Sequence, residues 1–331
     1  MAKFALWWVR WDGSDYVSRM TVWDRKATAG DFRERGFEGI VILDGEGRNS
    51  HCSGFMYSNG YKDGRELAEW VLSPGVDTSL YVTIPFYRPD GKQRDQAQAS
   101  FSSVPDSYYR GWIDGVLSID NSDLRGFYWS YESCLQTGNY GKNVSEEFIQ
   151  SLHDYVHGHG EELMWIPATG NRGVTYLDDP SFCAIQSLAG YFDYIFVQPN
   201  YYQNSTLNEK YGTVPYTYQK LIEKVEWIDN MPGNVSIEME VDRSILYNYI
   251  SRTHIEENFR EPLIERCGPR FTHECLIQYT CDAKEIAFHY LKAQKDVLNR
   301  KYKDLAYYFS VDLRVIDEMK GFSRRLGEAY V

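Results

Sequence analysis

The stretch Val235-Ser236-Ile237-Glu238-Met239-Glu240-Val241-Asp242 alternates apolar and polar residues without a break, and three of its polar residues are acidic. A period of two predicts a β-strand with one apolar face and one anionic face. Three carboxylates along one side of a strand are costly in a packed interior unless each is hydrated, paired or shares a proton. We therefore expect this strand to form the floor of a polar cleft.

Similar strand-like runs recur along the chain, with helix-like segments between them. The runs cover residues 4–11, 39–44, 79–86, 124–132, 162–169, 194–201, 235–242 and 305–312. Apolar positions at helical spacing predict helices over residues 65–72, 108–117, 145–157, 180–189, 216–228 and 283–300. Eight alternations of strand and helix predict an α/β fold, a (β/α)8 TIM barrel that forms a single domain over residues 1–331.

A doubly wound open sheet would give a similar rhythm of strands and helices. Such a sheet usually carries a glycine-rich phosphate loop after its first strand, and residues 11–15, Trp-Asp-Gly-Ser-Asp, do not form one. The connection over residues 243–304 is long enough for two helices and an irregular insert around Gly268-Pro269-Arg270. We interpret it as an elaboration of the barrel between the seventh and eighth strands, because it shows no hydrophobic core of its own.

Composition and charge restrict the classes of partner. The chain has 331 residues, of which 43% are hydrophobic and 25% charged, as in folded globular proteins. Its 47 acidic residues against 35 Lys and Arg give a formal charge of -12, which argues against nucleic acid and anionic membrane surfaces as partners. A neutral or cationic ligand fits better. The composition leaves the oligomeric state open.

The N-terminus enters a strand directly, without the pattern of a signal peptide, and no apolar run approaches membrane-spanning length. This is consistent with a cytoplasmic protein or with a secreted one whose signal has been removed. Six cysteines occur without a Cys-x-x-Cys motif. For Cys267, Cys275 and Cys281 beside His273 we expect free thiols or one disulfide rather than zinc, and we predict no metal or cofactor.

In a (β/α)8 barrel the functional residues lie at the carboxyl ends of the strands. Cleavage of a glycosidic bond needs two carboxyl groups, one to protonate the leaving oxygen and one to attack or to activate water. Glu132 ends the fourth predicted strand among aromatic residues, which suits the acid role, and Glu240 on the seventh is predicted to be the nucleophile or base. We expect the deeper Glu238 to orient Glu240 or to pair with Arg10.

Other polar and aromatic residues close the predicted strands and complete the candidate substrate site. Trp11, Trp129, Trp165 and Tyr202 are predicted to stack on sugar rings. Gln198, Asn200 and Tyr202 are predicted either to hydrogen-bond hydroxyl groups and the neighbouring carboxylate or to cap a loop. The predicted substrate-binding set also includes Arg10, Asp44, Glu238 and Asp312.

Three segments together resemble a known family. Phe127-Tyr128-Trp129-Ser130-Tyr131-Glu132, Phe196-Val197-Gln198-Pro199-Asn200-Tyr201-Tyr202 and Val235–Asp242 resemble motifs of a glycoside-hydrolase-like barrel family catalogued as a domain of unknown function, the domain 4855 group. The resemblance implies a (β/α)8 fold. The placement of Glu132 and Glu240 is also similar to that of the acid/base and nucleophile in the large retaining-glycosidase clan, although Tyr131 stands where that clan usually has Asn.

These observations predict a glycoside hydrolase that acts on a polysaccharide or glycoconjugate. Two alternatives stay open. The first is a carbohydrate-binding barrel without catalysis. The second is a metal-dependent hydrolase that uses Asp44, Glu238, Glu240 and Asp312 as oxygen ligands of a hard cation.

Overall fold

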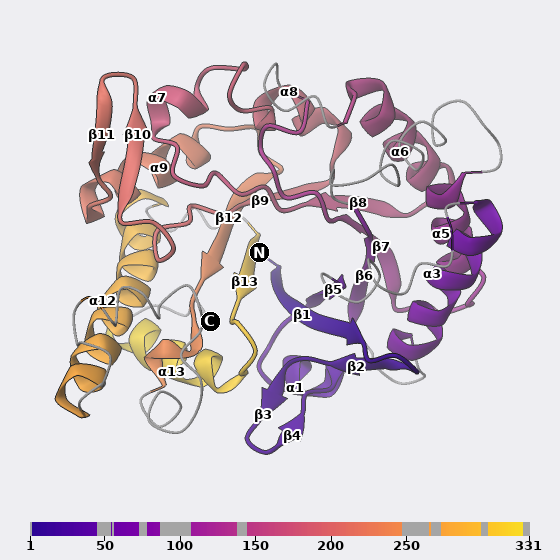
Figure 1. Ribbon diagram of the computed structural model, residues 1–331, viewed down its shortest axis with the longest axis horizontal. Helices are drawn as coiled ribbons and strands as arrows, with labels where there is room; N and C mark the ends of the chain where they lie inside the picture. The colour runs from indigo at the N-terminus through magenta and orange to yellow at the C-terminus, as the bar shows by residue number, and fades with distance from the viewer. Residues whose placement is uncertain are drawn as a thin grey trace.

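The structure is a computed structural model that describes residues 2–44, 54, 56–72, 78–86, 107–137, 144–246, 265, 273–298 and 304–326. Eight parallel strands close into a barrel (Figure 1), because the last strand pairs with the first. In chain order they are β1 (Lys3–Trp11), β5 (Gly39–Asp44), β6 (Ser79–Ile84), β7 (Leu124–Trp129), β8 (Glu162–Trp165), β9 (Tyr194–Val197), β12 (Val235–Glu240) and β13 (Leu305–Tyr308). Each lies largely within one of the predicted runs, and the predicted TIM-barrel fold is confirmed.

Helices surround the strands (Figure 1). They are α1 (Ala29–Arg33), α3 (Tyr57–Val71), α5 (Tyr108–Leu117), α6 (Glu146–Gly158), α7 (Val174–Leu177), α8 (Ile185–Leu188), α9 (Tyr218–Asp229), α12 (His273–Leu298) and α13 (Arg314–Arg325), with 3-10 turns η1 (Ala189–Tyr191) and η2 (Arg243–Ile245). The single helix predicted over residues 180–189 is wrong. Short helices flank a turn there, in which the Ser181 N–H donates to Asp179 Oδ1 at 2.8 Å beside Pro180, which has no N–H for a helix.

Several short elements decorate the barrel. β2 (Tyr16–Ser18) pairs antiparallel with the end of β1. Two hairpins, β3 (Thr21–Val22) with β4 (Arg25–Lys26) and β10 (Thr206–Glu209) with β11 (Gly212–Pro215), project from loops. In the long connection before β13, the structure describes η2 and α12, whereas the insert around Gly268-Pro269-Arg270 lies outside the described residues. Cys275 is disulfide-bonded and Cys281 is free, and Cys267 also lies outside the described residues.

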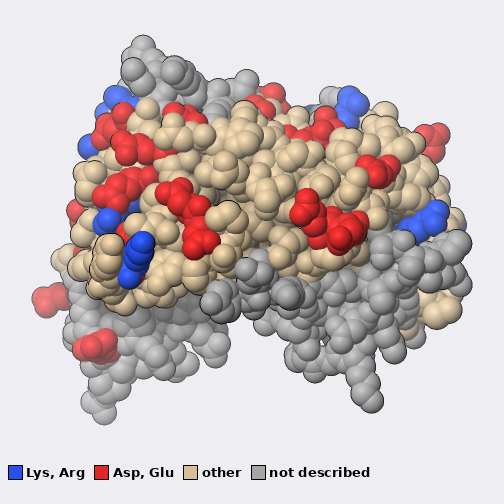
Figure 2. Space-filling view, turned by 90° about the horizontal axis from the view of Figure 1, so that it is seen from above, with Lys and Arg blue, Asp and Glu red and all other residues tan. Residues whose placement is uncertain are grey.

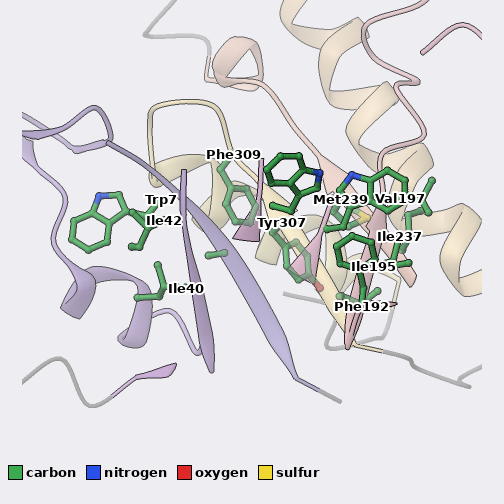
Figure 3. Packing of buried hydrophobic residues seen from close by; sticks show 14 of the residues in the cluster. Trp7, Ile40, Ile42, Phe192, Ile195, Val197, Ile237, Met239, Tyr307 and Phe309 are labelled. Carbon is green, nitrogen blue, oxygen red and sulfur yellow. The ribbon is translucent and has the colours of Figure 1, made fainter. Parts of the chain in front are cut away.

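The hydrophobic core forms two layers, one on each face of the strands. The inner layer fills the barrel with Phe4, Leu6, Val41, Leu43, Tyr81, Tyr128, Met164, Ile166, Phe196 and Ala306. The outer layer lies between strands and helices, and Figure 3 shows part of it, including Ile237 and Met239 of β12. Because side chains alternate along a strand, Glu238 and Glu240 face the inside of the barrel. The alternation in β12 thus sets an apolar outer face against an acidic inner one.

The surface carries the negative balance of the sequence. On the face shown in Figure 2, acidic side chains gather in several clusters and basic side chains are sparse. Among the described helices, none has both the length and the apolar character needed to cross a bilayer.

Candidate active site

Glu238 and Glu240 stand one above the other on the inner face of β12. The parallel register with β13 pairs Glu238 with Ala306 and Glu240 with Tyr308. Both glutamates are only 1% exposed. Burial raises the pKa of Glu238 well above its ordinary value, and the charges of Glu240 and Glu132 raise it further. The environment of Glu238 therefore favours its neutral form over its charged form.

Neutral hydrogen-bond donors hold the Glu240 carboxylate. The Asn200 N–H donates to Oε2 at 2.6 Å, the Tyr290 hydroxyl donates to the same oxygen at 2.8 Å, and Asn200 Nδ2 donates to Oε1 at 3.3 Å. Burial raises the pKa of Glu240 to about 7, against the lowering effect of these donors and of the Lys224 charge. The group can therefore change its protonation state near neutral pH.

Asn200 reaches Glu240 because its backbone is in the left-handed region, with φ at 55°. Asparagine tolerates this conformation better than most residues. The Gly170 N–H donates to Asn200 Oδ1 at 2.6 Å, and Gln198 Oε1 accepts from Asn200 Nδ2 at 3.4 Å. Asn200 therefore serves both roles weighed from the sequence, since it caps a loop and also binds the neighbouring carboxylate.

Glu132 lies just beyond the end of β7, on the other strand of the predicted pair. The Tyr128 hydroxyl donates to Glu132 Oε1 at 2.9 Å, and the Ala168 N–H donates to the Glu132 carbonyl at 2.6 Å. The side chain is partly exposed. Its charge raises the pKa of both Glu238 and Glu240. The structure thus brings Glu132, Glu238 and Glu240 into one electrostatic cluster at the carboxyl end of the barrel.

A cavity of about 530 Å³ opens beside Glu240. Its walls come from the loop after β9, the end of β12 and the first half of α12, which runs alongside β12 (Figure 1). Tyr201, Tyr202 and Tyr216 give it an aromatic side, while Glu240 and Asp242 give it an acidic one. The Ser244 N–H holds Asp242 Oδ1 at 2.6 Å, and burial raises the pKa of Asp242. The described lining residues include no Lys, Arg or His.

Sequence reasoning missed two residues that support this site. Lys224 of α9 is fully buried, and its Nζ donates to Pro199 O at 2.9 Å and Thr169 Oγ1 at 3.0 Å. Burial lowers the pKa of Lys224 to about 7, while the Glu240 charge raises it. The sequence contained a sign of this role, because Lys224 is a charged residue within the apolar stripe of α9. Tyr290, the second missed residue, lies within a long helix where nothing marks its hydroxyl as functional.

Two predicted stacking residues lie on the wrong face. Trp129 and Trp165 have no exposed surface and belong to the outer layer of the core. The Trp129 ring packs against Phe148 at 5.5 Å and the Trp165 ring stacks on Phe192 at 5.4 Å. Their positions in strands β7 and β8 point outward, opposite to Tyr128, so the prediction that they line a cleft is wrong.

The remaining predicted residues have varied positions. Asp312 is buried and its Oδ1 accepts from Arg314 Nε at 2.9 Å, so it forms a structural ion pair. Asp44 Oδ2 accepts from the Tyr16 hydroxyl at 3.1 Å, and Trp11 packs edge-on against Tyr16 at 5.3 Å. Arg10 is exposed, and no ion pair among the described residues joins it to Glu238.

Asp44, Glu238, Glu240 and Asp312, the ligands weighed for the alternative metal-dependent hydrolase, do not form a metal site in the described part of the chain. There, no group of three or more His, Cys, Asp and Glu side chains is arranged to hold a metal ion. One of these four acids, Asp312, forms an ion pair with Arg314 instead.

Comparisons with known proteins add the following likenesses. An uncharacterized protein of Methanocaldococcus jannaschii is 28% identical over 96% of this chain and 91% of its own length. A GH18 chitinase from Pseudoalteromonas aurantia matches at 10% identity and a TM-score of 0.47, covering 96% of this chain and 99% of that one. A xylanase and alpha-amylase inhibitor protein from Scadoxus multiflorus matches at 11% identity and a TM-score of 0.41, covering 99% of each chain.

A family model gives the more specific result. It is described as "Domain of unknown function (DUF4855)" and matches residues 117–255, a segment that contains all three motifs on which the resemblance depends. The resemblance of this chain to the domain 4855 group is therefore confirmed.

Proposed function

We propose that this protein is a glycoside hydrolase that cleaves a polysaccharide or glycoconjugate with Glu132 and Glu240 as its two catalytic carboxyl groups. The observation that carries the proposal is the gathering of Glu132, Glu238 and Glu240 at the carboxyl end of the barrel, with Glu240 at the wall of a cavity. Barrel enzymes place their chemistry at this end.

The surroundings of Glu240 suit a nucleophile or base. Such a group must be ionised when it reacts, and the donors from Asn200 and Tyr290 favour the ionised form. They also fix the direction of the carboxylate. Burial and the charges of Glu240 and Glu132 favour the neutral form of Glu238, and a neutral Glu238 removes one source of repulsion below an ionised Glu240.

The position of Glu132 suits a general acid. It is partly exposed, so a glycosidic oxygen can approach it, and Tyr128 orients its carboxyl group. In the proposed reaction Glu132 donates its proton to the leaving oxygen as the glycosidic bond breaks. Glu240 either attacks the anomeric carbon or takes a proton from the water that attacks it. The anomeric form of the first product distinguishes these two courses.

Digestion of a glycan panel read by mass spectrometry tests the proposal, with wild type, Glu132→Gln and Glu240→Gln compared side by side. We expect both variants to lose about 10³-fold or more in rate on the glycan that wild type cleaves. Glu162→Gln is the matched control, because Glu162 begins β8 at the opposite end of the barrel, where it binds the Tyr81 hydroxyl. Full activity in either active-site variant would refute the mechanism.

Two further results would point to the alternatives. Binding of a glycan by wild type without any cleavage would favour the carbohydrate-binding barrel. Loss of cleavage after dialysis against a chelator would favour a metal-dependent hydrolase, whereas a two-carboxylate enzyme should keep its rate.

A further inference from the structure

Three buried polar atoms on or just after β1, β12 and β13 have no hydrogen-bond partner among the described residues. They are Trp8 Nε1, Glu238 Oε1 and Ser310 Oγ, and all three are buried. Glu238 is 1% exposed and Ser310 is 2% exposed. Burying a polar group without a partner is unfavourable, and native proteins keep such groups where another requirement outweighs the loss. A ligand that bonds to all three would be such a requirement.

Trp8 lies in β1 and Glu238 in β12, and Ser310 follows the end of β13, the strand between them. β13 lies between β12 and β1, and Ala306 of β13 pairs in register with Glu238 on one side and with Phe4 on the other. Trp8 and Tyr308 both pack against the inner core cluster, and their rings meet edge-on at 5.8 Å. Because Tyr308 also pairs in register with Glu240, Trp8 belongs to the same wall of the barrel as the candidate carboxylates.

Ser310 follows the end of β13 in a conformation that serine rarely adopts. Its φ is 55°, in the left-handed region. Strained backbone of this kind gathers at functional sites, where the surrounding structure holds it in place. This observation is independent of the missing hydrogen bonds.

We propose that Trp8 Nε1, Ser310 Oγ and Glu238 Oε1 form a subsite that binds the hydroxyl groups of a neutral sugar ring. The inference rests on the proposed glycoside hydrolase function and names its substrate class. An indole N–H can only donate, a hydroxyl can donate and accept, and a carboxyl oxygen can accept, which complements a ring bearing several hydroxyl groups. The formal charge of -12 and the charge of the nearby Glu132 disfavour an anionic sugar. Arg19 covers one face of the Trp8 ring at 4.2 Å, so the edge of the indole, rather than that face, is used for binding.

Thermal unfolding of the free protein tests whether the three groups are truly unpartnered. Trp8→Phe removes the N–H and keeps an aromatic ring, and Trp112→Phe is its control, because Trp112 Nε1 donates to Thr83 O at 2.7 Å. We expect Trp8→Phe to lower the Tm less than Trp112→Phe does, with a difference between the two variants of about 2 °C or more. Ser310→Ala should leave the Tm unchanged or raise it, whereas Ser18→Ala should lower it, because Ser18 Oγ bonds to Trp7 Nε1 and Met20 O.

Ligand protection then tests the sugar. The proteins are the single variant Glu240→Gln and three double variants in which Glu240→Gln is combined with Trp8→Phe, Ser310→Ala or Ser18→Ala. Each protein is mixed separately with cellotetraose, the N-acetylglucosamine tetramer or tetragalacturonate. We expect at least one neutral tetrasaccharide to raise the Tm and tetragalacturonate to have no effect. Trp8→Phe and Ser310→Ala should each require about tenfold more of that sugar for the same shift, and Ser18→Ala should not.

Several outcomes would overturn the subsite. In the ligand experiment these are an equal rise in Tm for all the variants, no rise in Tm with either neutral sugar, or a rise in Tm with tetragalacturonate. In the free protein, a fall in Tm in Trp8→Phe as large as that in Trp112→Phe would also overturn it. The two proposals can also fail separately. Cleavage by wild type with equal protection of the variants would retain the hydrolase and reject the subsite. Selective protection without cleavage of any glycan would retain the subsite and reject the hydrolase.

Discussion

Glu240 and Asp312 are both buried carboxylates at the carboxyl ends of adjacent strands, yet they have opposite surroundings. Asp312, beyond β13, is bound by the Arg314 guanidinium. Glu240, on β12, is held by neutral donors from Asn200 and Tyr290 and lines a cavity. The Arg314 guanidinium gives Asp312 a full counter-charge, whereas Glu240 is bonded by neutral donors and its raised pKa of about 7 lets it change protonation near neutral pH. The nature of the partner therefore separates the structural acid from the candidate functional one.

The largest expected effect comes from neutralising each acid in turn. Glu240→Gln should remove cleavage. At pH 8 its Tm should equal or exceed that of wild type, because the variant no longer buries an ionisable group. Asp312→Asn should keep activity within a few-fold but lower the free energy of unfolding by about 2 kcal/mol, since the buried ion pair between Asp312 and Arg314 is lost. Rate assays and thermal unfolding of both variants check the contrast. A severe loss of activity in a folded Asp312→Asn would contradict it.

The barrel could be predicted from the sequence because strand-like and helix-like runs alternate along the chain, and each barrel strand lies largely within one of those runs. The sequence also predicted that Glu132, Glu238 and Glu240 would gather, since the carboxyl ends of parallel strands meet at one end of a barrel. It failed for Trp129 and Trp165, because nearness to a strand end was weighed above the strict alternation that turns both rings outward. That alternation could have been read from Tyr128 and Glu132, which share the inward face.

The partners of the acids could not be predicted in the same way. Asp312 meets Arg314 only two residues away, but an acid near a strand end has the same pattern whether or not a guanidinium folds back on it. Tyr290 is 50 residues from Glu240 in the sequence, and only the packing of α12 against β12 brings its hydroxyl to the carboxylate. Such contacts depend on tertiary structure and leave no local pattern.

A second prediction concerns stability against pH. The pKa of Glu240 is raised from 4.5 to about 7 on folding, so above pH 4.5 the folded state binds more protons than the unfolded state. The stability from this group is fully present below about pH 4.5 and is lost as the pH rises through about 7, a change of about 3 kcal/mol. Urea unfolding between pH 4.5 and 7.5 should show this fall in wild type and a smaller one in Glu240→Gln. Identical slopes would mean that Glu240 does not titrate in this range.

The smallest predicted effect isolates one donor. Tyr290→Phe removes the hydroxyl that bonds to Glu240 Oε2 at 2.8 Å and keeps the ring. That bond lowers the pKa of Glu240, so its loss should raise this pKa. If Glu240 must be ionised to react, the acidic limb of the pH–rate profile should move to higher pH by about half a unit to one unit, because one unit corresponds to about 1.4 kcal/mol. The maximal rate should fall less than in Glu240→Gln. Tyr57→Phe is the control, since the Tyr57 hydroxyl donates to Asp114 at 2.7 Å and not to the active-site cluster. An acidic limb that stays in place in Tyr290→Phe, or moves equally in Tyr57→Phe, would show that neutral donors around Glu240 do not set its ionisation and would remove the distinction drawn between Glu240 and Asp312.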